Sequence, residues 1–461
     1  MNIHNCGTRL LAAAVSLALV CITFESHSST NQPTGWLTQP LSLNEAIDIA
    51  LRQNSAILRS QQDLEAAHGV VVQTRAIVLP KLQATGNYEY NDAIETTSIG
   101  PNTFSFQNDQ SWNTGLRLVQ SVYEGGRMTS ALRTAKLTKE QALLQHQAII
   151  ADTLLEVRKA YYGTLLAEQQ IKVQAASVDL LQRELEDTTR RYDAGTVPRF
   201  DVLRAEVELA NARPRLSRAR NAWRISKNNV ANLLGLNIPP HVWEDIPLHL
   251  TDRLEVVPYQ IALPAAIAQA LERRPELGAL RNAEALAHES VVNARSGYKP
   301  SVQIYGGYSW RNSAFVDDLT EEVRGWNAGA QLNWSIFDGR LTQGRTMEAK
   351  AIEQKTAVEL DNTSRLIELE VRTAYSSFIE AREVLESSEK VVEQGEEALR
   401  LAKSRYEAGT GTQLDVLNAE TSLTEARTTK NVALHDYLVA RASLERAIGQ
   451  DVPVKAAPNE K

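Results

Sequence analysis

Cysteine is nearly absent from this 461-residue chain, and long apolar runs are scarce. The two cysteines, Cys6 and Cys21, both stand near the N-terminus, so a chain trimmed near Ser28 carries no thiol and forms no disulfide. Beyond the N-terminus, no segment approaches the roughly 18 consecutive apolar residues that mark a membrane-spanning helix. A membrane-spanning part would therefore have to be β-structure, because backbone polar groups must be satisfied in lipid.

Basic clusters and catalytic motifs are lacking as well. The net charge is −7, and lysine and arginine are scattered among acidic residues, so we expect no nucleic-acid binding. The 8 histidines are isolated, and neither a Cys/His cluster nor a glycine-rich phosphate loop occurs. The sequence therefore predicts a protein that is not an enzyme and that has no catalytic residues, no metal and no cofactor.

The N-terminus has the layout of a secretory signal peptide, which we predict over residues 1–28. A positively charged start is followed by the apolar run LLAAAVSLALVCITF and then by small and polar residues. A transmembrane anchor is the alternative, but about 15 apolar residues are short of the roughly 20 that a spanning helix needs. Cys21 loosely fits a lipoprotein cleavage site, although the bulky Val20 before it disfavours lipid attachment.

The rest of the chain consists of two copies of one unit. LSLNEAIDIAL, which begins at Leu41, aligns with IALPAAIAQAL, which begins at Ile261. Further along, at a slightly smaller but constant offset, SVYEG aligns with SIFDG, VRKAY with VRTAY, and RYDAGT with RYEAGT. Each copy is therefore expected to form the same supersecondary unit.

The change of offset shows where the copies differ in length. It falls between residues 90 and 112, where the first copy has six extra residues, and we expect a surface loop there. The constant offset downstream is expected of long helices that pack in register. We predict a first repeat over 41–240, a proline-rich linker over 241–260, a second repeat over 261–450 and a C-terminal tail over 451–461.

Four segments alternate strictly between apolar and polar residues. Period two predicts strands with one apolar and one polar face, at about 80–90, 112–123, 299–310 and 326–337. Tyrosine and tryptophan gather toward the ends of these segments, as they do at the membrane interfaces of transmembrane strands. The expected interface aromatics are Tyr88, Tyr90, Trp112, Tyr308, Trp310, Trp326 and Trp334. The half-buried strands of a soluble sandwich are the alternative.

Four strands are too few to close a barrel. The smallest outer-membrane barrels use about eight strands, and an open sheet edge is not tolerated in hydrocarbon. The strands of several copies would therefore have to join, and the sequence pattern alone permits any closing multiple.

Between the strands, the composition predicts helices far longer than those of globular proteins. From about Arg127 to Arg190 there is no proline, the only glycine is Gly163, and apolar residues recur at helical spacing. A helix of about 64 residues would be roughly 95 Å long, so it needs partners along its whole length. We expect coiled-coil packing against shorter helices stacked end to end. These are 200–234 followed by 263–296 in one copy, and 414–448 with 43–78 in the other.

Together these features resemble the TolC-like outer membrane efflux proteins over essentially the whole mature chain. The resemblance rests on the duplication, on Pro80 and Pro300 before the strands, and on SVYEGG and SIFDGR after them. The turns RYDAGTVPRFDVL and RYEAGTGTQLDVL complete it. The fold class it implies is an internally duplicated α+β membrane protein with four transmembrane strands and long coiled-coil hairpins per chain.

The resemblance further implies a homotrimer, in which a 12-stranded β-barrel in the lipid of the cell outer membrane stands on a periplasmic α-barrel. It implies two partners, a periplasmic adaptor protein and an inner-membrane pump. The expected function is the exit duct of a tripartite efflux system for small molecules. Type I secretion of proteins is the alternative, and the pump that the duct serves would discriminate the two. A scaffold would be favoured if the purified protein failed to conduct ions.

The two turns also have structural explanations. Glycine is expected where a helix ends in a left-handed residue, Thr412 with Asp415 forms a capping box, and Pro198 can start a helix. By resemblance the turns form the periplasmic tip and gate, with expected residues Arg191, Tyr192, Gly195, Asp201, Arg405, Tyr406, Gly409 and Asp415. Our hypothesis is that Tyr406 and Arg405 bind the adjacent hairpin. Some family members carry arginine and an acidic residue where this chain has Gly411 and Asn418.

Overall fold

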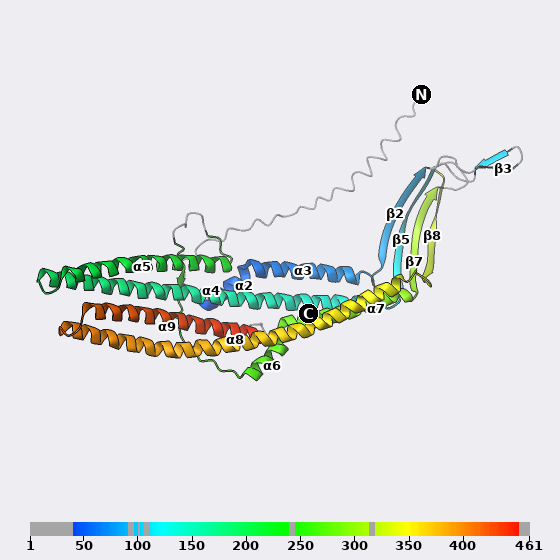
Figure 1. Ribbon diagram of the computed structural model, residues 1–461. Helices are drawn as coiled ribbons and strands as arrows, with labels where there is room; N and C mark the ends of the chain where they lie inside the picture. The colour runs from blue at the N-terminus through cyan, green and yellow to red at the C-terminus, as the bar shows by residue number, and fades with distance from the viewer. Residues whose placement is uncertain are drawn as a thin grey trace, which may run out of the picture.

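The computed structural model describes residues 40–90, 96–99, 102–105, 110–238, 245–312 and 319–450. The chain is long and narrow, with a four-stranded sheet at one end and helices that run from it to two hairpin turns at the other end (Figure 1). The expected signal peptide, residues 1–28 with Cys21, and the expected tail, residues 451–461, lie outside the described residues.

Two helices of 67 residues each run through most of this length. They are α4, Arg127–Asp193, and α8, Leu341–Glu407, and each is about 100 Å long at 1.5 Å per residue. Among the described helices, none combines the length and the apolarity needed to cross a membrane. The proline-free stretch from Arg127 onward is one continuous helix, as its composition predicts.

Shorter helices pack beside the two long ones. Helix α5, Arg199–Leu233, returns from the first turn along α4, and α9, Gln413–Ile448, returns from the second turn along α8. Nearer the sheet lie two pairs of short helices, each pair interrupted by one residue with an extended backbone, Asn54 or Arg274. The pairs are α2, Leu43–Gln53, with α3, Ser55–Arg75, and α6, Leu263–Arg273, with α7, Pro275–Arg295.

The prediction that 200–234 continues into 263–296, and 414–448 into 43–78, is wrong. The end of α5 meets the break between α2 and α3, where Asn54 Nδ2 donates a hydrogen bond to the carbonyl of Leu233 (2.6 Å). The end of α9 meets the break between α6 and α7, where Arg274 Nη1 donates to the carbonyl of Ala447 (3.3 Å). We call these contacts the first and the second joint. Helices therefore stack within one copy, because the linker carries the chain away from the end of α5 to α6 (Figure 1).

The first joint is packed mainly by apolar side chains. Val157 and Leu165 of α4 and Val230 of α5 are buried there together with Leu234. Full burial of such a side chain contributes about 1.5–3 kcal/mol. Apolar packing, with the single amide of Asn54, therefore holds this joint.

The second joint adds an ion network to a similar apolar cluster around Phe378 and Leu444. Arg446 Nη2 lies 2.6 Å from Glu276 Oε1, and Arg274 donates to the same carboxylate at 3.0 and 3.1 Å. Burial would raise the pKa of Glu276, but the charges of Arg274 and Arg446 outweigh it and hold that pKa below its usual value. Directional ion pairs therefore reinforce the second joint.

The linker ties the copies together at the level of the joints. Residues 241–244 lie outside the described residues, and β6, His249–Leu250, pairs in parallel with β1, Pro40–Leu41. The hydroxyl of Tyr161 lies 2.9 Å from both the carbonyl of Leu41 and Asp252 Oδ2, and burial raises the pKa of Tyr161. The predicted linker is therefore a strap that is hydrogen-bonded to the first copy.

The sheet is antiparallel throughout, with the order β2-β5-β7-β8. Its register aligns apolar residues with apolar residues: Tyr88 lies opposite Trp112, and Leu116 opposite both Ala84 and Tyr308. Most apolar residues of the four strands consequently share one face, and polar residues such as Gln83 and Gln303 share the other, together with Val119 and Tyr305. This confirms the two faces expected from the period of two. The strands are β2, Lys81–Tyr90, β5, Gln110–Glu124, β7, Ser301–Asn312, and β8, Glu322–Asn333.

Two details of the sheet differ from the expected strands. The fourth strand, expected over 326–337, ends at Asn333, so Trp334 follows the strand. The reason is that β7 begins only after Pro300, which has no N–H to donate, and β8 has no partner beyond Ser301. The region of the six extra residues, expected to be a plain surface loop, contains a short hairpin of β3, Thr96–Ile99, and β4, Asn102–Ser105.

Candidate functional site at the helical tips

Both hairpins turn in the same way. Gly195 and Gly409 adopt left-handed φ values of 72° and 71°, which favour glycine. At the second tip the N–H of Gly409 donates to the carbonyl of Tyr406 (3.1 Å), and the N–H of Thr410 to that of Arg405 (2.9 Å). The first tip repeats both bonds, and these contacts satisfy the last carbonyls of the helix. The turn chemistry expected from the two glycines is confirmed.

The starts of the two return helices differ. At α9, Thr412 and Asp415 form the predicted capping box, and the pKa of Asp415 is lowered because the backbone N–H and the hydroxyl of Thr412 donate to it. At α5 the position before the helix is Pro198, which offers no side-chain cap, so Asp201 makes no such box. The two repeated aspartates are therefore not equivalent.

The two hairpins of one chain touch near their tips. The guanidinium carbon of Arg191 on α4 lies 4.7 Å from the ring centroid of Tyr406 on α8, a cation–π arrangement. Close by, Gln413 Nε2 of α9 donates to Thr188 Oγ1 of α4 (2.8 Å), and both residues are buried. Arg191 also pairs with Asp187 on its own helix (2.7 Å). A cationic and a neutral polar contact therefore join α4 to the second hairpin.

The other expected tip residues lie around this contact. The hydroxyl of Tyr406 is buried without a hydrogen-bond partner in the part of the chain that the structure describes, and burial raises its pKa. Arg405 is exposed, and its charge adds a minor lowering of the pKa of Asp415. Tyr192, the counterpart of Tyr406, is 42% exposed. Within one chain, Arg191 rather than Arg405 is the arginine that contacts Tyr406.

Sequence reasoning missed a buried carboxylate one turn further from the tip. Glu420 on α9 is only 4% exposed, and neither of its oxygens has a hydrogen-bond partner among the described residues. Its nearest charge is Lys403 Nζ on α8, at 3.5 Å, and Glu184 of α4 also acts on it. Burial raises the pKa of Glu420 to about 7, the charge of Lys403 lowers it, and that of Glu184 raises it further. Glu420 is therefore poised to change its charge near neutral pH.

A groove of about 420 Å³ runs beside this carboxylate between α4, α5 and α9. It is lined by Glu208 and Arg215 from α5, by Gln174 from α4, and by Glu420 and Thr424 from α9. Its walls are mostly polar side chains, which suit contact with water or with polar groups.

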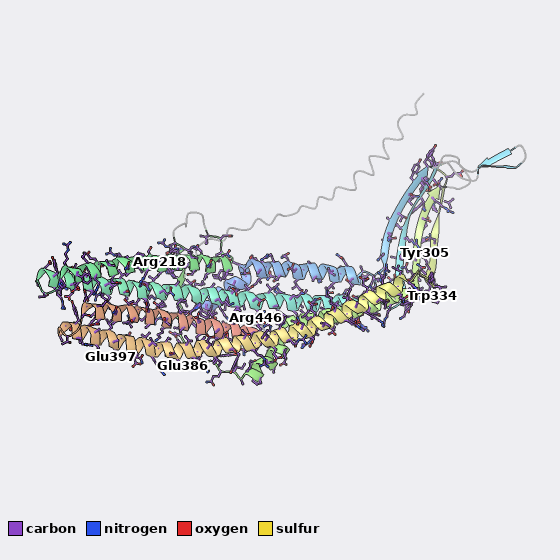
Figure 2. All side chains as sticks on the ribbon, in the orientation of Figure 1. Arg218, Tyr305, Trp334, Glu386, Glu397 and Arg446 are labelled. Atoms are coloured by element: carbon purple, nitrogen blue, oxygen red, sulfur yellow. The ribbon has the colours of Figure 1, made fainter. Side chains whose placement is uncertain are left out.

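The aromatic residues of the sheet form two groups. Tyr308 is packed edge-on against Trp310 and Trp326, with ring centroids 4.6 and 5.1 Å apart. This group lies in the half of the sheet that points away from the helices, together with Tyr88, Tyr90 and Trp112. Trp334 lies at the helical end, where its Nε1 donates to the carbonyl of Tyr298 (3.2 Å) (Figure 2). The aromatics therefore occur toward both ends of the apolar face.

The polar face of the sheet carries charge. The guanidinium of Arg117 stacks 4.2 Å above the ring centroid of Tyr305, and Gln303 donates to Glu124 (3.2 Å). Tyr305, labelled in Figure 2, is an aromatic residue of this face and was not among the expected interface aromatics. Its alternation with Ile304 and Gly306 could have shown that it lies on the polar side.

The chain has two similar helical hairpins, each about 100 Å long, joined to a sheet with one apolar face. This architecture defines the class of protein, and one family matches the chain. The chain matches the family described as outer membrane efflux protein at residues 46–236 and 266–450. These matches fill most of it, so the chain belongs to the outer membrane efflux protein family. The expected function of an outer-membrane efflux channel is thereby confirmed.

Individual relatives are distant but cover most of the chain. It is 24% identical to the outer membrane protein TolC of Vibrio cholerae over 412 residues, 88% of this chain and 90% of the relative. It is 25% identical to the alkaline protease secretion protein AprF of Pseudomonas aeruginosa, over 88% of this chain and 83% of AprF.

Among solved structures, the outer-membrane channel OprN superposes with a TM-score of 0.76 at 20% identity, covering 88% of this chain and 89% of OprN. The open state of the Neisseria gonorrhoeae MtrE channel superposes with a TM-score of 0.70 at 23% identity, covering 88% of both chains. These likenesses show the fold.

Proposed function

We propose that three copies of this chain assemble into the exit duct of a tripartite efflux system. Four strands from each copy would form a 12-stranded barrel in the outer membrane, and the hairpins would form an α-barrel in the periplasm. Small molecules would pass from an inner-membrane pump and a periplasmic adaptor through this duct to the exterior. The first and second repeats, 41–240 and 261–450, would contribute equivalent halves of each third of the duct.

The observation that carries the proposal is the sheet. Its apolar face is continuous over all four strands, and its edge strands, β2 and β8, have 10 and 12 residues with no further partner among the described strands. Strands of about 10 residues suit a bilayer, and an open edge in lipid requires a partner strand. Joining β8 of one copy to β2 of the next satisfies both edges, with the apolar face toward lipid and the polar face toward water.

The tips support a gate. Arg191, Tyr406 and Gln413 link the two hairpins of one chain, and Asp415 would stand three times around the axis of a trimer, where like charges repel. We infer that these contacts hold the narrow end closed, and that an adaptor opens it by offering better contacts in the open state.

Protein secretion is a second candidate function, favoured by the similarity to the alkaline protease secretion protein AprF. The same duct would then serve an ATP-driven exporter instead of a drug pump. Cross-linking in cells, followed by identification of the inner-membrane partner, distinguishes the two.

Electron microscopy of the detergent-solubilised protein, combined with single-channel recording in planar bilayers, tests the proposal. We expect particles with threefold symmetry, a barrel at one end and a tapered tube at the other, together with ion conductance. Monomeric particles would refute it, as would a trimer that does not conduct even when Arg191→Ser removes the cation–π contact that holds the tip closed.

A further inference from the structure

The charged residues on the polar face of the sheet are not evenly spread along the strands. Its two acidic residues, Glu89 and Glu124, lie toward opposite ends of this face. Its three basic residues, Lys81, Arg117 and Arg311, lie between them in the register of the strands, without an ion pair among the described residues. The central part of the polar face is therefore positively charged in each chain.

Arg117 lies farthest from the two carboxylates. It stands opposite Gln83 on β2 and opposite Gly307 on β7. Gln83 is six residues from Glu89 along β2, and Gly307 is six residues from the partner of Glu124 along β7. At about 3.4 Å per residue, each carboxylate is roughly 20 Å from the level of Arg117, or about two Debye lengths at 0.1 M salt. Neither acidic residue therefore neutralises Arg117.

The side chain of Arg117 is held against the wall of the sheet. Its guanidinium carbon lies 4.2 Å from the ring centroid of Tyr305, and Arg117 is exposed while Tyr305 is half-buried, so the cation is the layer that faces water. Glycines leave room for this stack. A Cβ at Gly329 would lie 2.8 Å from the hydroxyl of Tyr305, and one at Gly307 would lie 2.5 Å from the carbonyl oxygen of Leu116. The charge therefore has a fixed place on the polar face.

We propose that the middle of the barrel lumen favours small anions over small cations, and that Arg117 sets this preference. The inference rests on the proposed function, because only a closed barrel turns the polar faces of several copies toward one lumen. Three copies of Arg117 would then stand at one level, where the described strands have no carboxylate. Small molecules with a carboxylate, sulfonate or phosphate group are the class that this part of the duct favours.

A cysteine beside Arg117 can report the local potential in the full-length protein. Asn327 is exposed on β8, at the level of Arg117 and opposite Gly307, and the expected mature chain has no other thiol. Asn327→Cys is reacted in vesicles with two thiosulfonate reagents, one with a sulfonate and one with a quaternary ammonium group. The measured quantity is the ratio of the anionic to the cationic rate. A nearby positive charge also raises the thiolate fraction, but that effect is equal for both reagents and cancels in the ratio.

Replacing Arg117 should lower this ratio. For a charge about 8 Å from the thiol in water, Arg117→Gln should lower it about 2-fold at 0.1 M salt and about 4-fold at 0.01 M. Arg117→Glu should lower it about 5-fold at 0.1 M, because the charge is reversed. Arg117→Lys keeps the charge and should keep the ratio of the wild type at this position. Equal ratios with arginine, glutamine and glutamate would overturn the proposal.

A second cysteine on the same face serves as the matched control. Asn333 is exposed at the helical end of β8, six residues from Asn327, which is about 20 Å along the strand. At 0.1 M salt the ratio at Asn333→Cys should not change with Arg117→Gln, because the charge is screened over that distance. An equal change at both cysteines would indicate a rearrangement of the whole sheet, which overturns the assignment to Arg117.

The outcomes separate this inference from the function on which it rests. If neither cysteine reacts with either reagent, or if the wild-type protein is not a trimer, the water-filled barrel fails and this inference fails with it. If the protein is a trimer and both cysteines react, but the ratio at Asn327→Cys does not depend on the residue at position 117, only the anion preference is overturned.

Discussion

We predict that Glu420 makes the contact between the hairpins dependent on pH. Its folded-state pKa is about 7 against an ordinary value of 4.5, because burial disfavours the ionised form. The contribution of Glu420 to the free energy of unfolding is therefore fully present below pH 4.5, where the carboxyl is protonated in both states. It is lost as the pH rises toward the folded-state pKa of about 7. The difference between the two pKa values, about 7 and 4.5, corresponds to about 3 kcal/mol. This is the largest loss in the free energy of unfolding that ionisation of Glu420 can cause at pH 8.

Amide hydrogen exchange of α9 near the tip measures this cost locally. In the wild type, the free energy of local opening should fall by up to about 3 kcal/mol between pH 4.5 and 8, after correction for the intrinsic exchange rate. Glu420→Gln, which cannot ionise, should remove this dependence. Lys403→Met should enlarge it, because Lys403 is the charge that lowers the pKa of Glu420.

Glu425→Gln is the matched control, because Glu425 is an exposed glutamate of the same helix, two positions after the buried Leu423. It should keep the wild-type dependence on pH. The reasoning is refuted if Glu420→Gln shows the same fall in opening free energy as the wild type.

Three further predictions concern the sheet and the tip. Leu116→Arg, in the middle of β5, should lower the free energy of unfolding by about 2–4 kcal/mol, measured by folding titrations in vesicles. Leu332→Arg, near the end of β8, should lower it by only about 0–1 kcal/mol. Equal losses for the two variants would contradict the placement of the sheet in the membrane. Arg191→Ser should raise single-channel conductance because it removes the cation–π contact, whereas Tyr406→Phe keeps the ring and should leave the conductance unchanged. An equal rise in both variants would contradict this and would indicate that the hydroxyl of Tyr406 has a partner on another copy. Single cysteines introduced on the polar face should react with a water-soluble thiol reagent, and those introduced on the apolar face should not. Equal labelling of both sets would contradict the assignment of the two faces. The positions are Gln83, Asn87 and Gln303 on the first face, and Leu82 and Ile304 on the second.

Local rules explain what the sequence could predict. The period of two determined which residues share a face of the sheet, and the absence of proline from Arg127 onward allowed one continuous helix. Gly195 and Gly409 marked the turns, because a left-handed residue at a helix end favours glycine. These features depend on neighbouring residues along the chain.

Contacts between distant segments were not predictable in the same way. Chain order suggested that 200–234 stacks on 263–296, but the linker crosses to another part of the molecule. Glu420 lies in the buried stripe of α9 with Val416 and Leu423, and that spacing was a readable signal. Its counterpart in the first copy, Glu206, is exposed, so comparison of the two copies did not show that Glu420 is buried.

The two joints give the hairpins unequal stiffness. At each joint the long helix is continuous and the shorter helices beside it are interrupted. Resistance to rotation of the hairpin therefore comes from the side chains around the interruption. Apolar packing at the first joint has no preferred direction, so the only directional contact that a rotation of α5 strains there is the hydrogen bond from Asn54 to the carbonyl of Leu233. At the second joint any rotation of α9 pulls Arg446 away from Glu276. We therefore expect the first hairpin to rotate about its joint more easily than the second, so that relative motion of the tips arises mainly in the first copy.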